Sequence, residues 1–190
     1  MPTIRKHLAI ALGAFALPFG GALQQCTPSY VEPHRVTIVG DSISVDTRDE
    51  FQQAIDDVHV NAIWGRGWDS NAGGQTFPTF RQAILAEVPN IEAGGWLIIQ
   101  DDGGEGPTSP EIVAWVLSAV PDNVNIGWVS PSNNERSWTA DSQANIRAAD
   151  VTYIDWHSVA LANPQLLTDG LHLNQDGQWA LTHVVWSVTS

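Results

Sequence analysis

The stretch TIVGDSISVD (residues 37–46) decides the fold, because it runs from a buried strand directly into a polar turn. Residues 35–40 are rich in β-branched side chains, which favour a strand inside a sheet. Gly40, Asp41 and Ser42 follow at once. We therefore expect Ser42 to be presented where the strand ends, close to the start of the next helix.

Strand-like and helix-like segments alternate along the rest of the chain, and no repeat interrupts them. The patterns predict strands at residues 35–40, 58–64, 96–100, 124–130 and 151–156, and helices at residues 46–57, 77–88, 110–120, 139–149 and 174–188. Such alternation indicates an α/β fold with a five-stranded parallel sheet covered on both faces. Ligands of these sheets bind beyond the carboxyl ends of the strands, which is where Ser42 is expected.

Length and charge limit the possible functions. A chain of 190 residues, 43% apolar and 15% charged, is typical of one globular domain. The net charge of −13 disfavours nucleic acid and anionic lipid as partners, because both would be repelled. We expect a monomer that acts on a neutral small molecule or glycan.

The first 26 residues have the features of an export signal, with Arg5 and Lys6 ahead of an apolar stretch. A structural N-terminal helix is the alternative. Cleavage at the small residues 20–22 predicts ordinary secretion, whereas residues 23–26, LQQC, resemble a lipoprotein box with an unusual Gln before Cys26. We favour secretion, because the lipoprotein peptidase usually requires a small residue at that position.

The predicted organisation is therefore a signal peptide at residues 1–26, a short tether at 27–34 and the domain at 35–190. The protein is expected outside the cell or in a bacterial cell envelope, and at a membrane only if Cys26 is lipidated. Cys26 is the only cysteine, so no intrachain disulfide can form.

A serine is a poor nucleophile without a base, so Ser42 needs a histidine and an orienting acid. The segment LLTDGLHLNQDG (residues 166–177) places Asp169 three residues before His172 in a glycine-containing turn. This spacing allows the carboxylate to hold one imidazole nitrogen while the other faces a serine. His157, which follows the fifth predicted strand, is the only rival base.

GDS near the start of the domain and DGLH near its end resemble the motifs of the SGNH/GDSL hydrolases. These are serine esterases with a flavodoxin-like three-layer fold that act without a metal or another cofactor. The resemblance implies Ser42 as nucleophile, His172 as general base and Asp169 as its orienting acid. The alternative is that Asp41 and Ser42 only cap a helix and that Asp169 and Gly170 only form a turn.

The family also supplies a glycine and an asparagine to the oxyanion hole. Gly65 best matches the glycine, with Gly67 second. Where the family has Gly-x-Asn-Asp, this chain has QDDGG at residues 100–104, so that Asp102 falls on the asparagine position. We expect Asp102 to turn away from the hole and the third donor to be Gln100 or the backbone of Gly103 and Gly104.

Nine tryptophans are many for a chain of this length, and most lie in predicted strands or helices, where packing explains them. Trp64 and Trp68 instead flank Gly65, and Trp138 follows the loop after the fourth predicted strand; we predict that these three line a cleft and stack on sugar rings or acyl chains. No His/Cys cluster indicates a metal site.

These features together predict a secreted serine esterase that hydrolyses or transfers short acyl groups on carbohydrate or other small esters. The DGLHL run (residues 169–173) also looks like the extracellular acyltransferase domains that modify cell-wall glycans. The alternative from another class is a catalytically weakened glycan-binding module, which the missing asparagine and the tryptophans near the cleft favour.

The export signal predicts the N-terminus of the mature protein. Material recovered from the native host should begin at about Leu23, or at a lipidated Cys26, because the leader is removed during export. Intact-mass spectrometry distinguishes the two by the mass of the lipid. An exported protein that still begins at Met1 would contradict both routes.

Overall fold

Five parallel strands form one sheet, as the sequence predicts, in a computed structural model that describes residues 33–102, 106–132 and 136–190. The strand order is β2-β1-β3-β4-β5. The strands are β1 (His34–Gly40), β2 (Val58–Ala62), β3 (Ile91–Gln100), β4 (Asn125–Val129) and β5 (Thr152–Ile154). The chain moves outward from β1 to β2 and then returns to β3 on the other side of β1. The carboxyl ends of β1 and β3 therefore flank a topological switch point, where α/β sheets bind their ligands.

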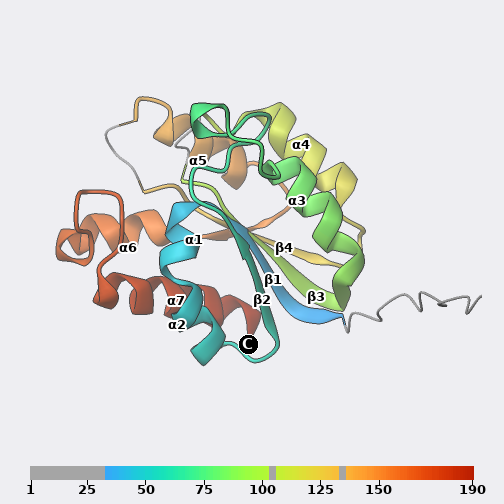
Figure 1. Ribbon diagram of the computed structural model, residues 1–190, viewed down its shortest axis with the longest axis horizontal. Helices are drawn as coiled ribbons and strands as arrows, with labels where there is room; N and C mark the ends of the chain where they lie inside the picture. Colours follow the sequence, from blue (N-terminus) through green and yellow to red (C-terminus); the bar gives the residue numbers. More distant parts are fainter. Residues whose placement is uncertain (1–32, 103–105, 133–135) are drawn as a thin grey trace, which may run out of the picture. The chain divides into compact units, whose positions relative to one another are not determined.

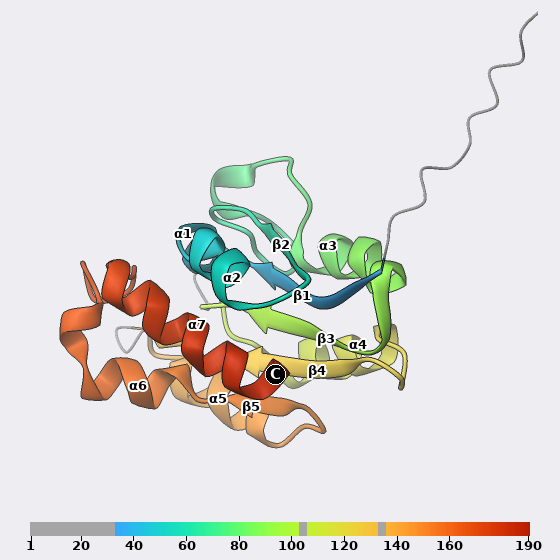
Figure 2. The ribbon, with the colours of Figure 1, turned by 90° about the horizontal axis from the view of Figure 1, so that it is seen from below.

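Helices cover both faces of the sheet, which confirms the predicted three layers (Figures 1 and 2). One face packs against α1 (Ser42–Asp46), α2 (Arg48–Ala54), α6 (Trp156–Ala162) and α7 (Gln175–Thr189). The other packs against α3 (Phe80–Glu87), α4 (Pro110–Ala119) and α5 (Thr139–Arg147). Short 3-10 helices lie at Ala72–Gly74, Val88–Asn90 and Pro164–Leu166.

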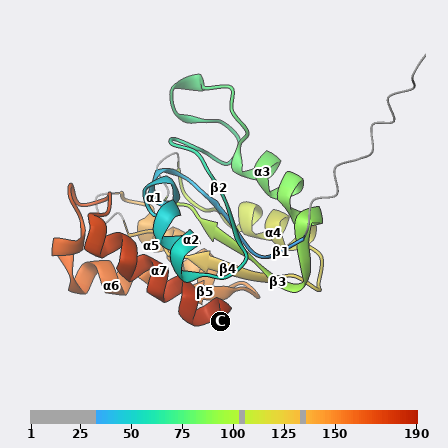
Figure 3. The ribbon, with the colours of Figure 1, turned by 60° about the horizontal axis from the view of Figure 1, so that its bottom comes forward.

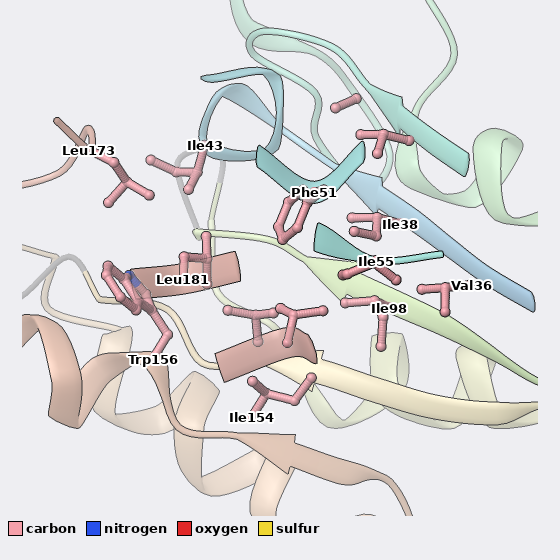
Figure 4. Packing of buried hydrophobic residues seen from close by; sticks show 14 of the residues in the cluster. Val36, Ile38, Ile43, Phe51, Ile55, Ile98, Ile154, Trp156, Leu173 and Leu181 are labelled. Carbon is pink, nitrogen blue, oxygen red and sulfur yellow. The ribbon is translucent and has the colours of Figure 1, made fainter. Parts of the chain in front are cut away.

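Alternate strand residues supply two separate cores, one on each face of the sheet. Ile38 and Ile98 belong to the core beneath α7, whereas Val39, Leu97 and Ile99 belong to the opposite core. This follows from the two-residue period of a strand, which points successive side chains to opposite faces. Figure 4 shows the first core, and Figure 3 shows α2 and α7 side by side over it.

The predicted helix at residues 46–57 is wrong at its start. The chain enters α1 at Ser42, because the Asp41 side chain caps the helix by accepting a hydrogen bond from the Ile43 N–H at 3.1 Å. The helix then breaks at Thr47 and resumes as α2. Ser42 therefore lies inside the first helical turn rather than in a loop before it.

Two further elements differ from the prediction. β3 begins at Ile91, five residues before the predicted strand, and α6 was not predicted because Trp156 was assigned to the end of a strand. Asp155 caps α6 by accepting a hydrogen bond from the Ser158 N–H at 3.2 Å. Within the described ranges, none of the helices is both long and apolar enough to cross a membrane.

The packing of α7 predicts the effect of one truncation. Leu181 is fully buried in the core beneath α7, so Leu181→Ala should lower the free energy of unfolding by about 3 kcal/mol and the Tm by roughly 10 °C. Leu161→Ala on α6 is the control, because Leu161 is 63% exposed and its truncation should cost under about 0.5 kcal/mol. Equal losses in thermal unfolding would contradict this packing of α7.

Candidate active site

Ser42 is the first residue of α1, directly after the end of β1. The turn between them is tight, since a Cβ atom on Gly40 would collide with the Ser44 side chain. Position 40 therefore requires glycine, because the Ser44 side chain lies where a Cβ atom would be. This glycine lets the chain change from strand to helix within two residues. The result is a half-buried Ser42 at the carboxyl edge of the sheet, where the sequence predicts it.

Gln100, at the end of β3, supports the first turn of α1 from below. Its side-chain oxygen accepts hydrogen bonds from the Ser44 N–H at 3.1 Å and the Ser44 hydroxyl at 2.9 Å, and its side chain also bonds to Asp41. Gln100 is 3% exposed. These contacts engage its amide with Ser44 and Asp41, so a role as an oxyanion donor stays a prediction that they do not favour.

Asp169 and His172 form the predicted pair. His172 Nδ1 lies 2.7 Å from Asp169 Oδ2, and the backbone N–H of His172 donates to Asp169 Oδ1 at 2.7 Å. These hydrogen bonds lower the pKa of Asp169 to about 2, so the carboxylate is ionised at neutral pH. With Nδ1 held by Asp169, Nε2 is left to exchange a proton with a substrate or a nucleophile.

The turn that carries this pair is closed by its own backbone. Gly170 has a φ of +85°, and the Thr168 N–H donates to the His172 carbonyl at 2.8 Å. An isolated antiparallel bridge joins Leu167 to Leu173. The conformation of the turn is therefore fixed by its own hydrogen bonds. These bonds orient the His172 imidazole without contacts from the other parts of the site.

Two observations bring the turn to α1. Leu173 and Ile43, each next to a predicted catalytic residue, share the core shown in Figure 4. Asp46 lies four residues after Ser42 and hence on the same face of α1. Burial raises the pKa of Asp46, while the nearby charge of His172 lowers it and that of Asp169 raises it, so Asp46 lies close to both groups.

The structure gives no hydrogen bond between Ser42 and His172, both of which it describes. Catalytic hydrogen bonds in ligand-free sites are often long and shorten only when substrate binds. The assignment of Ser42 as nucleophile thus stays a prediction that the arrangement of α1 and the 167–173 turn supports. Sequence analysis missed Asp46. The predicted helix began at residue 46, so Ser42 and Asp46 were not expected to lie on one face of the same helix.

Two backbone N–H groups beyond the carboxyl ends of β1 and β2, those of Ser42 and Gly65, are available to an oxyanion. In the described part of the chain, neither the Ser42 N–H nor the Gly65 N–H has a hydrogen-bond acceptor, whereas the Gly67 N–H donates to Asn71 at 3.2 Å. Gly65 has a φ of +71°, and a Cβ atom there would lie 2.8 Å from the Ala72 Cβ atom. The geometry therefore favours Gly65 over Gly67, as the sequence does.

Asp102 is turned toward β4. Its Oδ1 accepts from the Ser132 N–H at 3.1 Å and the Ser132 hydroxyl at 3.3 Å, and its own N–H donates to Asp41 Oδ2 at 2.9 Å. Its Oδ2 is buried without a hydrogen-bond partner. Gly103 and Gly104, the other predicted donors, lie outside the described residues.

Asp41, Asp101 and Asp102 form a buried acid cluster behind Ser42. Burial and the neighbouring charge of Asp101 raise the pKa of Asp41 to about 7. Arg66 is 2% exposed, and its charge reaches Asp41 while both of its terminal nitrogens bond to Asn61 at 2.7 Å. Burial lowers the pKa of this guanidinium to about 10, so it remains charged at neutral pH. Sequence analysis missed Arg66, because nothing in the sequence separates a buried arginine from a loop arginine.

The three candidate tryptophans have different surroundings. Trp68 is 7% exposed, packs on Phe80 and Trp128, and donates to Asp101 Oδ2 at 2.6 Å, which argues against the predicted stacking role. Trp138 is half-buried beside Arg136. Trp64 is 54% exposed, and its ring centroid lies 5.6 Å from that of His172. Trp64 is thus the tryptophan best placed to contact a substrate.

The structure also bears on two alternatives, which are His157 as the base and a bound metal ion. His157 is the second residue of α6, and its N–H donates to the Ser130 hydroxyl at 2.8 Å; no acid holds its ring in the described structure. In the described ranges, no group of three or more His, Cys, Asp or Glu side chains is arranged to hold a metal ion. The Asp169–His172 pair is therefore the better base.

Comparison with known proteins supports the fold. No protein-family model and no curated protein matches the sequence. The C-terminal catalytic domain of peptidoglycan O-acetyltransferase A from Streptococcus pneumoniae, solved with a methylsulfonyl adduct, matches with a TM-score of 0.67 and 16% identity over 82% of this chain and 92% of that one. A second structure from the same organism, described as a platelet activating factor, matches with a TM-score of 0.56 and 19% identity over 86% of this chain and 87% of that one. The likeness shows a shared fold.

The backbone at Gly65 predicts a selective effect of substitution. Gly65→Ala should slow hydrolysis of a simple ester at least tenfold, because the added Cβ meets Ala72 and displaces the adjacent N–H. Gly73→Ala is the matched control: its φ of +63° carries a similar strain of about 1–2 kcal/mol, but nothing lies within 4 Å of the added atom. If both variants are equally slow and equally destabilised in thermal unfolding, position 65 has no special role.

Proposed function

Since the chain shares the fold of SGNH-type enzymes, we propose that it is a serine esterase that hydrolyses or transfers short acyl groups through an acyl-enzyme. The observation that carries this proposal is the Asp169–His172 pair, 2.7 Å apart, on a turn packed against the helix that Ser42 begins. A hydroxyl, a base and an orienting acid on one edge of a parallel sheet are the groups that ester cleavage requires.

In the proposed acylation step, the Ser42 hydroxyl attacks the ester carbonyl while His172 Nε2 accepts its proton. Asp169 stabilises the imidazolium that forms, because its carboxylate lies against Nδ1. The oxyanion receives hydrogen bonds from the N–H groups of Ser42 and Gly65. His172 then returns the proton to the departing alcohol, and the acyl group remains on Ser42.

Deacylation repeats these events with a second hydroxyl. Water, or the hydroxyl of an acceptor, gives its proton to His172 and attacks the acyl-enzyme, which restores the Ser42 hydroxyl as the acid leaves or the acyl group moves on. The acceptor decides whether the reaction is hydrolysis or transfer.

An O-acetyl carbohydrate or peptidoglycan ester is the proposed substrate, with short-chain lipid esters second. Trp64 supports this choice, because an exposed indole beside His172 offers a face on which a sugar ring can stack. The net charge of −13 also suits a neutral glycan better than an anionic lipid surface. Such a substrate fits the proposed location outside the cell or in the envelope.

A glycan-binding module without catalysis is the second candidate. The missing asparagine favours it, because no amide stands at position 102 and an ionised carboxylate about 4 Å from an oxyanion would cost roughly 4 kcal/mol at an effective dielectric near 20, although Ser132 holds the Asp102 side chain toward β4. That cost would cancel one normal oxyanion donor. One measurement distinguishes the two functions, because only the esterase shows turnover that depends on Ser42.

Hydrolysis of nitrophenyl acetate by the purified protein tests the proposal. Ser42→Ala and His172→Ala should each lower kcat by about 10³-fold or more, because each removes a group that takes part in the reaction. Asp169→Asn should lower it to an equal or smaller extent, since a base in the wrong tautomer still works poorly.

His157→Ala is the matched control and should keep kcat within about threefold, because the proposal assigns His157 no role. Turnover that survives in Ser42→Ala would contradict the esterase. Wild-type protein that is folded, inactive and able to bind a glycan would favour the binding module.

A further inference from the structure

Trp64 leaves the sheet from the same level as Ser42, on the neighbouring strand. In the β1–β2 pairing Gly40 is opposite Ala62. Ser42 and Trp64 each follow two residues later in the chain. The Ile63 N–H, which donates to the Gly40 carbonyl at 3.2 Å, keeps the two backbones together beyond the strands. Trp64 therefore belongs to the same edge of the sheet as the proposed nucleophile.

A tight turn holds the Trp64 backbone. The Arg66 N–H donates to the Ile63 carbonyl at 3.3 Å, which closes a turn with Trp64 and Gly65 at its centre. Gly65 has a φ of +71°, a left-handed conformation that glycine adopts without a steric penalty. The N–H of Gly65 is a proposed oxyanion donor, so the indole projects from the residue that precedes this donor.

The Trp64 indole contacts the proposed base. Its ring centroid lies 5.6 Å from that of the His172 imidazole, and the two ring planes are inclined by 31°, nearer to stacked than to perpendicular. The contact connects the segment after β2 with the turn before α7. Asp169 binds the imidazole at Nδ1, on the edge of the ring, whereas Trp64 covers one of its faces. The ring is thus contacted from two directions.

These surroundings suit a charged imidazole. A cation within about 6 Å of the centroid of an indole is attracted by the electrons of the ring face. Two carboxyl groups add to this attraction, one from Asp169 at 2.7 Å and one from Asp46 on α1. Burial raises the pKa of Asp46, and the charge of His172 acts in the opposite direction, which shows that the two groups interact.

The interaction between the indole and the base changes during the proposed reaction. Before acylation the imidazole is neutral, and the indole only stacks on it. When His172 takes the Ser42 proton, the ring becomes an imidazolium and the cation–π attraction is added. Only an interaction that strengthens toward the transition state raises kcat. The indole is therefore placed to accelerate the reaction as well as to pack against the base.

We propose that Trp64 is a positioning residue of the base, whose indole packs on the His172 imidazole and stabilises the imidazolium that forms in acylation and deacylation. The inference rests on the proposed esterase function. Trp64 is 54% exposed, so the indole face that is turned away from His172 remains open to a sugar ring. The same side chain links the base to the turn that carries Gly65.

Hydrolysis of ethyl acetate, followed by titration of the released acid, tests this role with a substrate that has no ring to stack on an indole. Trp64→Leu should lower kcat about 5-fold to 30-fold and leave KM nearly unchanged, because leucine fills space but offers no ring face. Trp64→Phe should recover most of the loss, because a phenyl ring also attracts a cation. Thermal unfolding checks that both variants fold, as expected for an exposed position.

Trp186→Leu is the matched control. Trp186 is also an exposed tryptophan, at 45%, but it lies on α7 near Arg35 at the opposite edge of the sheet, so kcat should stay within about twofold. If Trp64→Leu raises KM and leaves kcat unchanged, the indole acts on the substrate and the inference is wrong. Equal losses of kcat in folded Trp64→Leu and Trp64→Phe would also contradict it, because the ring face would then have no effect.

Proton NMR tests the ring contact without any turnover. At about pH 9, where an ordinary imidazole is neutral, the His172 ring protons of the wild type should resonate upfield of those in Trp64→Leu, because they lie over an aromatic ring. The spectrum of His172→Ala identifies these signals.

The two measurements together separate the inference from the proposed function. A wild type with Ser42-dependent turnover whose His172 signals are unchanged in Trp64→Leu would overturn the inference and leave the esterase intact. A wild type that shows the upfield signals but no Ser42-dependent turnover would instead overturn the proposed function, and the catalytic effect of Trp64 with it.

Discussion

The Asp41 carboxylate is the contact on which the candidate site depends. One of its oxygens accepts from the Ile43 N–H and thereby starts α1, and the other accepts from the Asp102 N–H across the switch point. A single side chain thus joins the helix that presents Ser42 to the segment that follows β3. Gln100 reinforces the joint from beneath by accepting from Ser44. The position of Ser42 is set by these contacts rather than by the flexibility of a loop.

These contacts place carboxyl groups in the protein interior, where an ionised group loses the favourable free energy of hydration. Asp41 is 6% exposed, and two more carboxyl groups are buried beside it, while the terminal nitrogens of the nearby Arg66 bond to Asn61. A core optimised for stability alone would avoid such a cluster, because buried ions lose more in desolvation than they gain unless they are well paired. Acids whose pKa values are strongly shifted are instead typical of functional sites. The acid cluster is therefore better explained by what it does for Ser42 than by what it does for the fold.

The base, His172, is positioned in a different way from Ser42. Asp169 and His172 are held by one short turn whose internal hydrogen bonds join residues no more than four apart, and the Asn174 N–H closes the base of the turn by donating to the Leu166 carbonyl, eight residues away. The pair is half-exposed, so the imidazole can exchange protons with solvent, and Trp64 covers one side of it. The two halves of the candidate site thus differ in construction: the nucleophile side depends on contacts between strands, and the base side is preformed by its own sequence.

That difference explains what the sequence by itself determined. Five strands, their alternation with helices, Ser42 at the end of β1 and the Asp169–His172 turn are all readable from local patterns, because each depends on neighbours within a few residues. The helix cap at Asp41, which the sequence offered as an alternative, is local as well. Only the tertiary structure decided that Trp68 is buried against Asp101, that Gln100 supports Ser44, and that Asp102 faces Ser132. These contacts join residues 30 or more positions apart. No local pattern carries such information, since burial and hydrogen-bond partners across strands are fixed only when the sheet has assembled.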